Sequence, residues 1–111
     1  MSRYLVLYNS PVTASERMEA ANPEQMKKSM GDWMAWRDEA QKKVKVDFGM
    51  PLETRGRITP EGVEDSDIQV SGHSFLEGDR DVVMELLASH PHLKTKGATI
   101  DVLEEIPMPG L

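Results

Sequence analysis

The stretch Asn22-Pro23-Glu24-Gln25 marks the start of the longest helix that this sequence predicts. Asn is a strong N-cap, Pro is favoured at the first helical position, and Gln at the third can return a hydrogen bond to the cap. Side chains then recur at helical spacing, which predicts a helix that continues to about Val46. The stripe consists of Met26, Met30, Trp33, Arg37, Ala40 and Val44.

Strand-like segments lie on both sides of this helix. Alternating apolar side chains and β-branched residues predict strands over residues 3–8, 53–59, 67–77 and 99–106. The segment Phe48-Gly49-Met50-Pro51 is expected to break the long helix. A short helix is predicted over residues 13–21, and another helix begins after Asp79 and ends before Pro91.

The resulting order is strand, long helix, strand, strand, helix, strand. Two split βαβ units of this kind predict an α+β, ferredoxin-like fold, in which a four-stranded antiparallel sheet carries both helices on one face. The other face, which includes Phe75 and side chains of the first strand, needs a cover. Self-association through that face predicts a homodimer, because twofold symmetry is the commonest way to cover such a surface.

The composition narrows the class of protein. A length of 111 residues allows one domain, predicted here as residues 1–111. The absence of cysteine excludes disulfides and thiolate metal sites, and the formal net charge of -6 argues against a nucleic-acid partner. No membrane span and no export signal is recognised, so a cytoplasmic location is expected. No metal site and no cofactor are predicted, because ligand spacing and phosphate-binding loops are lacking.

Histidines are the candidates for acid–base chemistry. His73 lies in a predicted central strand, where it could act as a proton carrier or could fill a pocket wall. His90 and His92 flank Pro91 at the end of a helix. His92 is, beside His73, a candidate proton carrier, and His90 is a candidate substrate contact; for both, the alternative is a role in the helix C-terminus and the following turn.

Four further residues are candidates for contact with a substrate. Trp36 lies off the helical stripe and could line a cavity or an interface, whereas Trp33 is expected in the core. Asp47 could orient a histidine across the sheet, or lie in solvent. Arg57 could bind an anion, or protect an exposed edge strand. Phe75 would lie beside His73 on the less covered sheet face.

Taken together, these motifs resemble the YCII-related domain family, in particular its DGPF-type branch, from Arg3 to Gly110. The matching segments are Tyr4-Leu5-Val6-Leu7-Tyr8, Asn22-Pro23-Glu24-Gln25, Trp33-Met34-Ala35-Trp36, Val70-Ser71-Gly72-His73-Ser74-Phe75-Leu76-Glu77, His90-Pro91-His92-Leu93, Ile100-Asp101-Val102-Leu103-Glu104 and Met108-Pro109-Gly110. The resemblance implies a dimeric α+β barrel. The wider superfamily includes cofactor-independent isomerases, lyases and monooxygenases.

The chain departs from this family at three places. The His–Asp pair that some members carry on the first long helix is missing, since no histidine lies between Pro23 and Val46. The position of His73 is commonly an aromatic residue such as Tyr in this branch. Glu64-Asp65-Ser66-Asp67 stands where longer members have Asp-Gly-Pro-Phe. Two functions therefore stay open: a small-molecule enzyme of lyase or isomerase type with a histidine acid/base, and a non-catalytic ligand-binding or regulatory module.

Overall fold

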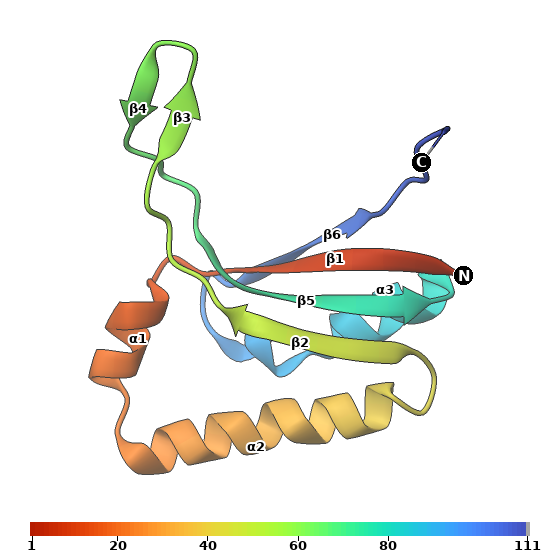
Figure 1. The fold of residues 1–111 in the computed structure, drawn as a ribbon. Coiled ribbons are helices and arrows are strands. Elements are labelled where there is room, and N and C mark those ends of the chain that lie inside the picture. Colours follow the sequence, from red (N-terminus) through yellow and green to blue (C-terminus); the bar gives the residue numbers. More distant parts are fainter. Residues whose placement is uncertain (111) are drawn as a thin grey trace.

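The computed structural model describes residues 1–110 and shows an α+β fold built on one antiparallel sheet (Figure 1). The sheet has four strands in the order β2-β5-β1-β6. Its strands are β1 (Ser2–Asn9), β2 (Lys45–Pro51), β5 (Val70–Gly78) and β6 (Thr99–Glu104). The helices are α1 (Ala14–Ala20), α2 (Pro23–Ala40) and α3 (Arg80–Ala88), and the short 3-10 helix η1 (Pro91–Lys94) lies between α3 and β6. This architecture confirms the predicted four-stranded antiparallel sheet and is compatible with a ferredoxin-like fold.

Helix α2 begins as predicted and ends earlier than predicted. The Asn22 side chain accepts a hydrogen bond from the Gln25 backbone N–H at 2.8 Å, and the Gln25 side chain accepts one from the Asn22 N–H at 3.4 Å. The helix ends at Ala40, however, and β2 begins at Lys45. The reason is the alternation that follows: Val44 and Val46 are buried while Lys45 is exposed, which is the period of a strand.

The predicted second strand was therefore misplaced. Residues 45–51, which include the expected helix break, form β2 at the edge of the sheet. Within residues 53–59 only β3 (Arg57–Thr59) is extended, and it pairs with β4 (Gly62–Glu64) rather than with the sheet. This β3–β4 hairpin projects away from the sheet (Figure 1). It turns at Gly62, whose φ of 132° favours a residue without a side chain.

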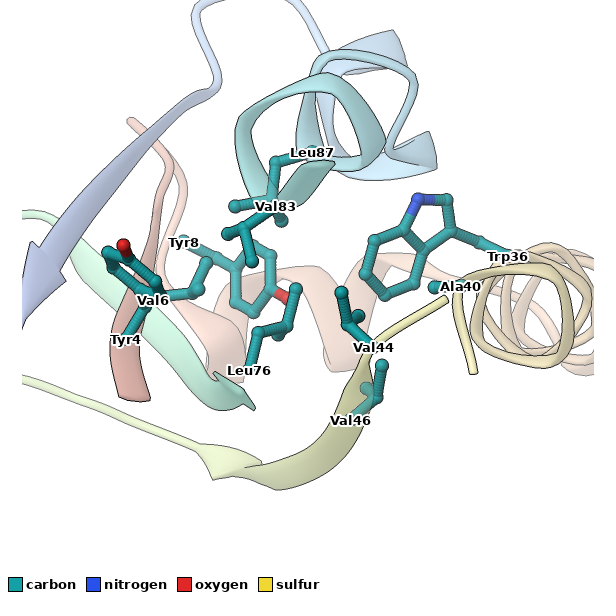
Figure 2. Close-up of a cluster of buried hydrophobic side chains, with 10 residues drawn as sticks. All are labelled: Tyr4, Val6, Tyr8, Trp36, Ala40, Val44, Val46, Leu76, Val83 and Leu87. Atoms are coloured by element: carbon teal, nitrogen blue, oxygen red, sulfur yellow. The ribbon is translucent and has the colours of Figure 1, made fainter. Parts of the chain in front are cut away.

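The core lies between the sheet and helices α2 and α3 (Figure 2). Alternate residues of β1 and β5 supply its sheet side, and apolar positions of the two helices close it. The buried residues are Tyr4, Val6, Tyr8, Trp36, Ala40, Val44, Val46, Leu76, Val83 and Leu87. The expected roles of the two tryptophans are thus reversed, because Trp36 is buried whereas Trp33 is only partly buried.

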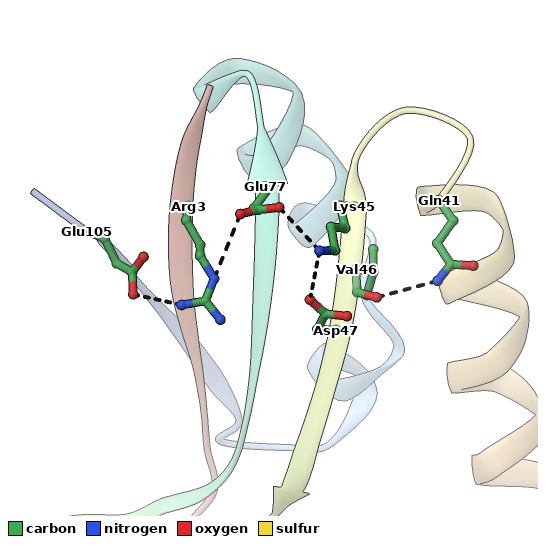
Figure 3. Close-up of polar contacts among 7 residues, drawn as sticks. All are labelled: Arg3, Gln41, Lys45, Val46, Asp47, Glu77 and Glu105. Carbon is green, nitrogen blue, oxygen red and sulfur yellow. Dashed lines mark hydrogen bonds and ion pairs between the residues drawn. The ribbon is translucent and has the colours of Figure 1, made fainter. Parts of the chain in front are cut away.

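The opposite sheet face is left uncovered by any helix. Following the strand register, its first row is Lys45, Glu77, Arg3 and Glu105, which alternate in charge across β2, β5, β1 and the end of β6 (Figure 3). The second row is Asp47, Phe75, Leu5 and Leu103. In the third row, His73 lies opposite Leu7, which pairs with Asp101. We call these three rows the open face.

Among residues 1–110, none of the helices combines the length and apolar character that crossing a bilayer requires.

Replacing Gly31 by Ala is expected to stabilise the fold by about 0.5–1 kcal/mol. Gly31 is exposed inside α2, and a Cβ atom there would meet no other atom within 4 Å, so no neighbouring group needs the space. Urea unfolding measures the gain. Gly62→Ala is the matched control: its Cβ would also meet open space, but its positive φ makes the change destabilising. A gain for both variants would contradict the conformational explanation.

Candidate functional site

A pocket of about 280 Å³ opens between α1, α2 and the sheet. Its wall is mostly apolar, and no Asp or Glu side chain lines it. The lining includes several aromatic and methionine side chains, which give an adaptable apolar surface. These include Tyr8, Met18, Met30, Trp33, Met34 and Phe48. Concave, apolar pockets with a few polar groups are the usual form of small-molecule sites.

His73 belongs to the third row of the open face, and it borders this pocket at the edge of the sheet, beside Gly49 of β2. Its Nδ1 atom is enclosed and has no hydrogen-bond partner within the described residues. The imidazole lies directly against the backbone of Gly49 in β2, where a Cβ atom would overlap the ring. Gly49 therefore provides the space that lets His73 occupy the wall, and β2 is irregularly paired at this point.

His92 reaches the same pocket from η1, although it is almost fully buried. Its Nε2 lies 2.8 Å from the backbone oxygen of Asn9. Because a carbonyl only accepts, Nε2 must carry the proton and donate it, which leaves Nδ1 as an unprotonated, enclosed acceptor without a partner among residues 1–110. Burial lowers the pKa of His92, while the contact with the Asn9 carbonyl opposes that shift.

His90 lies behind His92 in the core. Its Nδ1 accepts a hydrogen bond from the His92 backbone N–H at 2.9 Å, so this side chain caps η1. The ring packs against Trp33 and Trp36, with both pairs of ring centroids 4.4 Å apart. Burial lowers the pKa of His90 to about 3. His90 is therefore a neutral core residue that holds the turn carrying His92, rather than a substrate contact.

A buried hydroxyl pair lies next to the pocket, where Tyr8 forms part of the wall. The Tyr8 hydroxyl and the Ser74 hydroxyl are 2.7 Å apart and both are buried. Burial raises the pKa of Tyr8 to about 12, so this phenol stays protonated at neutral pH. The pair satisfies two polar groups inside the core.

Arg17 is the pocket residue that sequence reasoning missed. It lies on α1, is half-buried, and donates a hydrogen bond from Nη2 to the Ser10 hydroxyl at 2.7 Å. The sequence predicts a short helix here, but only the three-dimensional structure shows that Arg17 lies at the pocket, where it contacts Ser10 just after β1. No local pattern distinguishes it from the other arginines.

The remaining candidates lie elsewhere. Trp36 is in the core, where its indole N–H donates to the Leu86 carbonyl at 2.9 Å. Asp47 is on the open face, where it pairs with Lys45 at 3.9 Å instead of orienting a histidine. Phe75 lies on the same face beneath the Arg3 guanidinium.

Arg57 is on the β3–β4 hairpin, where it pairs with Glu64 and Asp67. Of the seven residues predicted for the site, only His73 and His92 line the pocket. Within residues 1–110 no cluster of three or more His, Asp or Glu side chains is placed to hold a metal ion.

No protein-family model and no curated protein sequence matches this chain, so the resemblance to YCII-related proteins stays a prediction.

Proposed function

We propose that this protein binds a small organic molecule in the pocket between α1, α2 and the sheet. The observation that carries the proposal is the convergence of His73 and His92, from different elements, on one mostly apolar pocket. A volume of about 280 Å³ is near the lower end for ligand sites and suits a small molecule rather than a nucleotide cofactor. The resemblance to a superfamily of cofactor-independent lyases and isomerases points in the same direction.

If the bound molecule is transformed, His73 is the group best placed to move a proton. The Nδ1 atoms of both histidines are enclosed, but the Nε2 proton of His92 is engaged by Asn9, whereas the Nε2 atom of His73 is not enclosed, so His92 is less suited. A histidine acid/base needs no cofactor and contributes roughly 10²–10⁴-fold to the rate of a proton transfer. This assignment gives a cofactor-independent lyase or isomerase with His73 as its acid/base.

One observation favours the non-catalytic alternative. Within residues 1–110, no carboxylate hydrogen-bonds to His73 or His92, so neither imidazole has the orienting partner typical of catalytic histidines. A pocket with this wall also serves a binding or regulatory module. Replacing His73 by Tyr separates the two functions: an enzyme loses roughly 10²-fold or more of its turnover, whereas a binding module keeps its ligand.

Binding itself is tested with 1-anilinonaphthalene-8-sulfonate, an apolar probe whose fluorescence rises when it leaves water. We expect saturable binding at one site per chain. Gly72→Val should weaken it at least tenfold, since Gly72 lines the pocket and a Cβ there meets only the Tyr8 ring, at 3.8 Å. Gly31→Ala, on the outer side of α2, is the control that should leave binding unchanged. Equal binding by all three proteins would place the probe outside the pocket.

We further propose that two copies pair through the open face. A twofold axis parallel to the strands, between β1 and β5, would set each β1 against the partner's β5 and each β2 against the partner's β6. The charged row alternates in sign over four positions, so it is complementary to its own copy under this operation. The same operation brings Leu5 against Phe75, which gives the interface an apolar centre, and it places the partner's Leu7 over His73 at the border of the pocket.

Arg3→Glu is expected to convert the dimer into monomers at micromolar concentration, because the introduced carboxylate would face Glu77 across the axis. Adding Glu77→Arg should restore the dimer, since each charge at positions 3 and 77 would again face an opposite charge on the other copy. Sedimentation equilibrium measures the mass in solution: a dimer gives about twice the 12.5 kDa chain mass, and a monomer gives the chain mass itself. Arg55→Glu, which changes an exposed arginine outside the open face, is the charge control. A monomeric parent protein would refute the pairing.

A further inference from the structure

We infer that the pocket selects an organic anion, specifically a small carboxylate with an apolar body, and that Arg17 binds its charge. This inference rests on the proposed binding function and names the class of ligand. It starts from an arginine that lines an otherwise apolar cavity.

The first step is the charge of Arg17. Among residues 1–110, the side chains of Arg3, Arg37, Arg55 and Arg57 each lie within 4 Å of a carboxylate, whereas no such pair is formed by Arg17 or Arg80. Arg80 is exposed and is solvated by water. Arg17 is half-buried beside an apolar wall, where an unneutralised guanidinium is costly. A bound anion would remove that cost.

The second step is orientation. Arg17 donates to the Ser10 hydroxyl, and Ser10 is itself buried and anchored by a 2.9 Å hydrogen bond from its N–H to the Gln69 carbonyl. The hydroxyl also accepts from the Val12 N–H at 3.2 Å, so its position is defined by two donors. A guanidinium has five N–H donors, and Ser10 takes one of them. The others remain for a planar carboxylate, which arginine binds with two parallel hydrogen bonds.

The third step is the remainder of the wall. No acidic side chain competes for Arg17 in the pocket, and Met18, Met30 and Trp33 offer apolar surface to the rest of the ligand. A single arginine neutralises one negative charge, which favours a carboxylate over a phosphate dianion. The volume restricts the apolar body to a ring or a short branched chain.

The test compares two probes of nearly equal shape, 4-phenylbutanoate and 4-phenylbutanamide, titrated at pH 7.5 and low salt by calorimetry. The acid should bind roughly 10-fold to 100-fold more tightly than the amide, the scale of a charge-assisted hydrogen-bond pair. Arg17→Met should bring the two dissociation constants together by weakening only the acid. Arg80→Met, the other arginine without a carboxylate partner among residues 1–110, should keep the preference.

The outcomes separate the two proposals. If both probes bind the parent protein equally and Gly72→Val abolishes both, the pocket binds ligands but the anion selectivity is wrong. If the Arg17→Met variant still binds the acid more tightly than the amide by the same factor, Arg17 is not the anion contact. If neither probe binds the parent protein, the binding function and the inference fall together. Arg17→Lys should keep part of the preference, because the charge stays while the paired donors are lost.

Discussion

Lowering the pH from 7 to 4 is expected to reduce the free energy of unfolding by about 3 kcal/mol through His90 alone. The unfolded chain protonates this histidine near pH 6.5, whereas the folded protein does not do so until its pKa of about 3. The unfolded state therefore binds more protons between these values. The loss is absent above pH 6.5 and grows as the pH falls towards 3. His92 acts in the same direction, since burial also lowers its pKa.

His90→Asn isolates this contribution. The Asn side-chain oxygen takes the place of Nδ1 as acceptor for the His92 N–H, so the cap of η1 is retained while the titrating group is removed. The variant loses packing against the tryptophans at every pH. The informative quantity is therefore the difference between unfolding free energies at pH 7 and pH 4, from urea titrations. That difference should be about 3 kcal/mol smaller in the variant, and equal differences would show that His90 does not stay neutral in the folded protein.

Leu76→Ala is expected to lower the stability by about 2–5 kcal/mol, a large fraction of the total for a domain of this size. Leu76 is fully buried on β5, the strand between β1 and β2, and its register partners Tyr4 and Val46 are also core residues. Truncation removes apolar contacts and leaves a cavity that three rigid strands cannot close. Urea unfolding at one fixed protein concentration measures the change, because self-association would otherwise contribute.

Met84→Ala is the matched control for this cavity. Met84 lies on α3 and is 48% exposed, so its truncation removes little buried surface and places the best helix former in a helix. Its effect should stay within about 0.5 kcal/mol. A loss for Leu76→Ala no larger than that of Met84→Ala would show that the core between sheet and helices is not packed as described.

Local chemistry was enough to predict most of the fold. The capping box at Asn22 and the alternation in β1 are short-range signals, and both are found where expected. The boundary between α2 and β2 was not predictable in the same way. Val44 satisfies the helical stripe as well as the strand alternation, and only packing against Leu76 and its neighbours decides between the two periods. Strand β2 therefore includes residues 48–51, which the sequence predicted as a helix break.

Only part of the candidate site was predictable, because the sequence shows residue types but not their three-dimensional surroundings. Histidines are rare enough in this chain for each to be considered, and two of the three line the pocket. Arg17 could not be selected, because it differs from the other arginines in combining partial burial at the pocket with the lack of a carboxylate partner among residues 1–110, and both are facts about three-dimensional surroundings. The same holds for Trp33 and Trp36: both pack against His90, but Trp33 lines the pocket and is therefore only partly buried.

The position of β1 in the middle of the sheet has a consequence for biosynthesis. Its pairing partners are residues 70–78 and 99–104, so the apolar segment from Tyr4 to Tyr8 emerges long before either neighbour exists. At about 5–20 residues per second, that interval lasts about 3–14 s, and contacts this distant in sequence also form slowly. The strand ends, however, are adjacent: the Glu105 N–H donates to the Arg3 carbonyl at 2.9 Å. A circular permutant that joins these ends and opens the chain in the β3–β4 hairpin turn would synthesise β1 directly after β6, and it should fold faster and aggregate less in the cell.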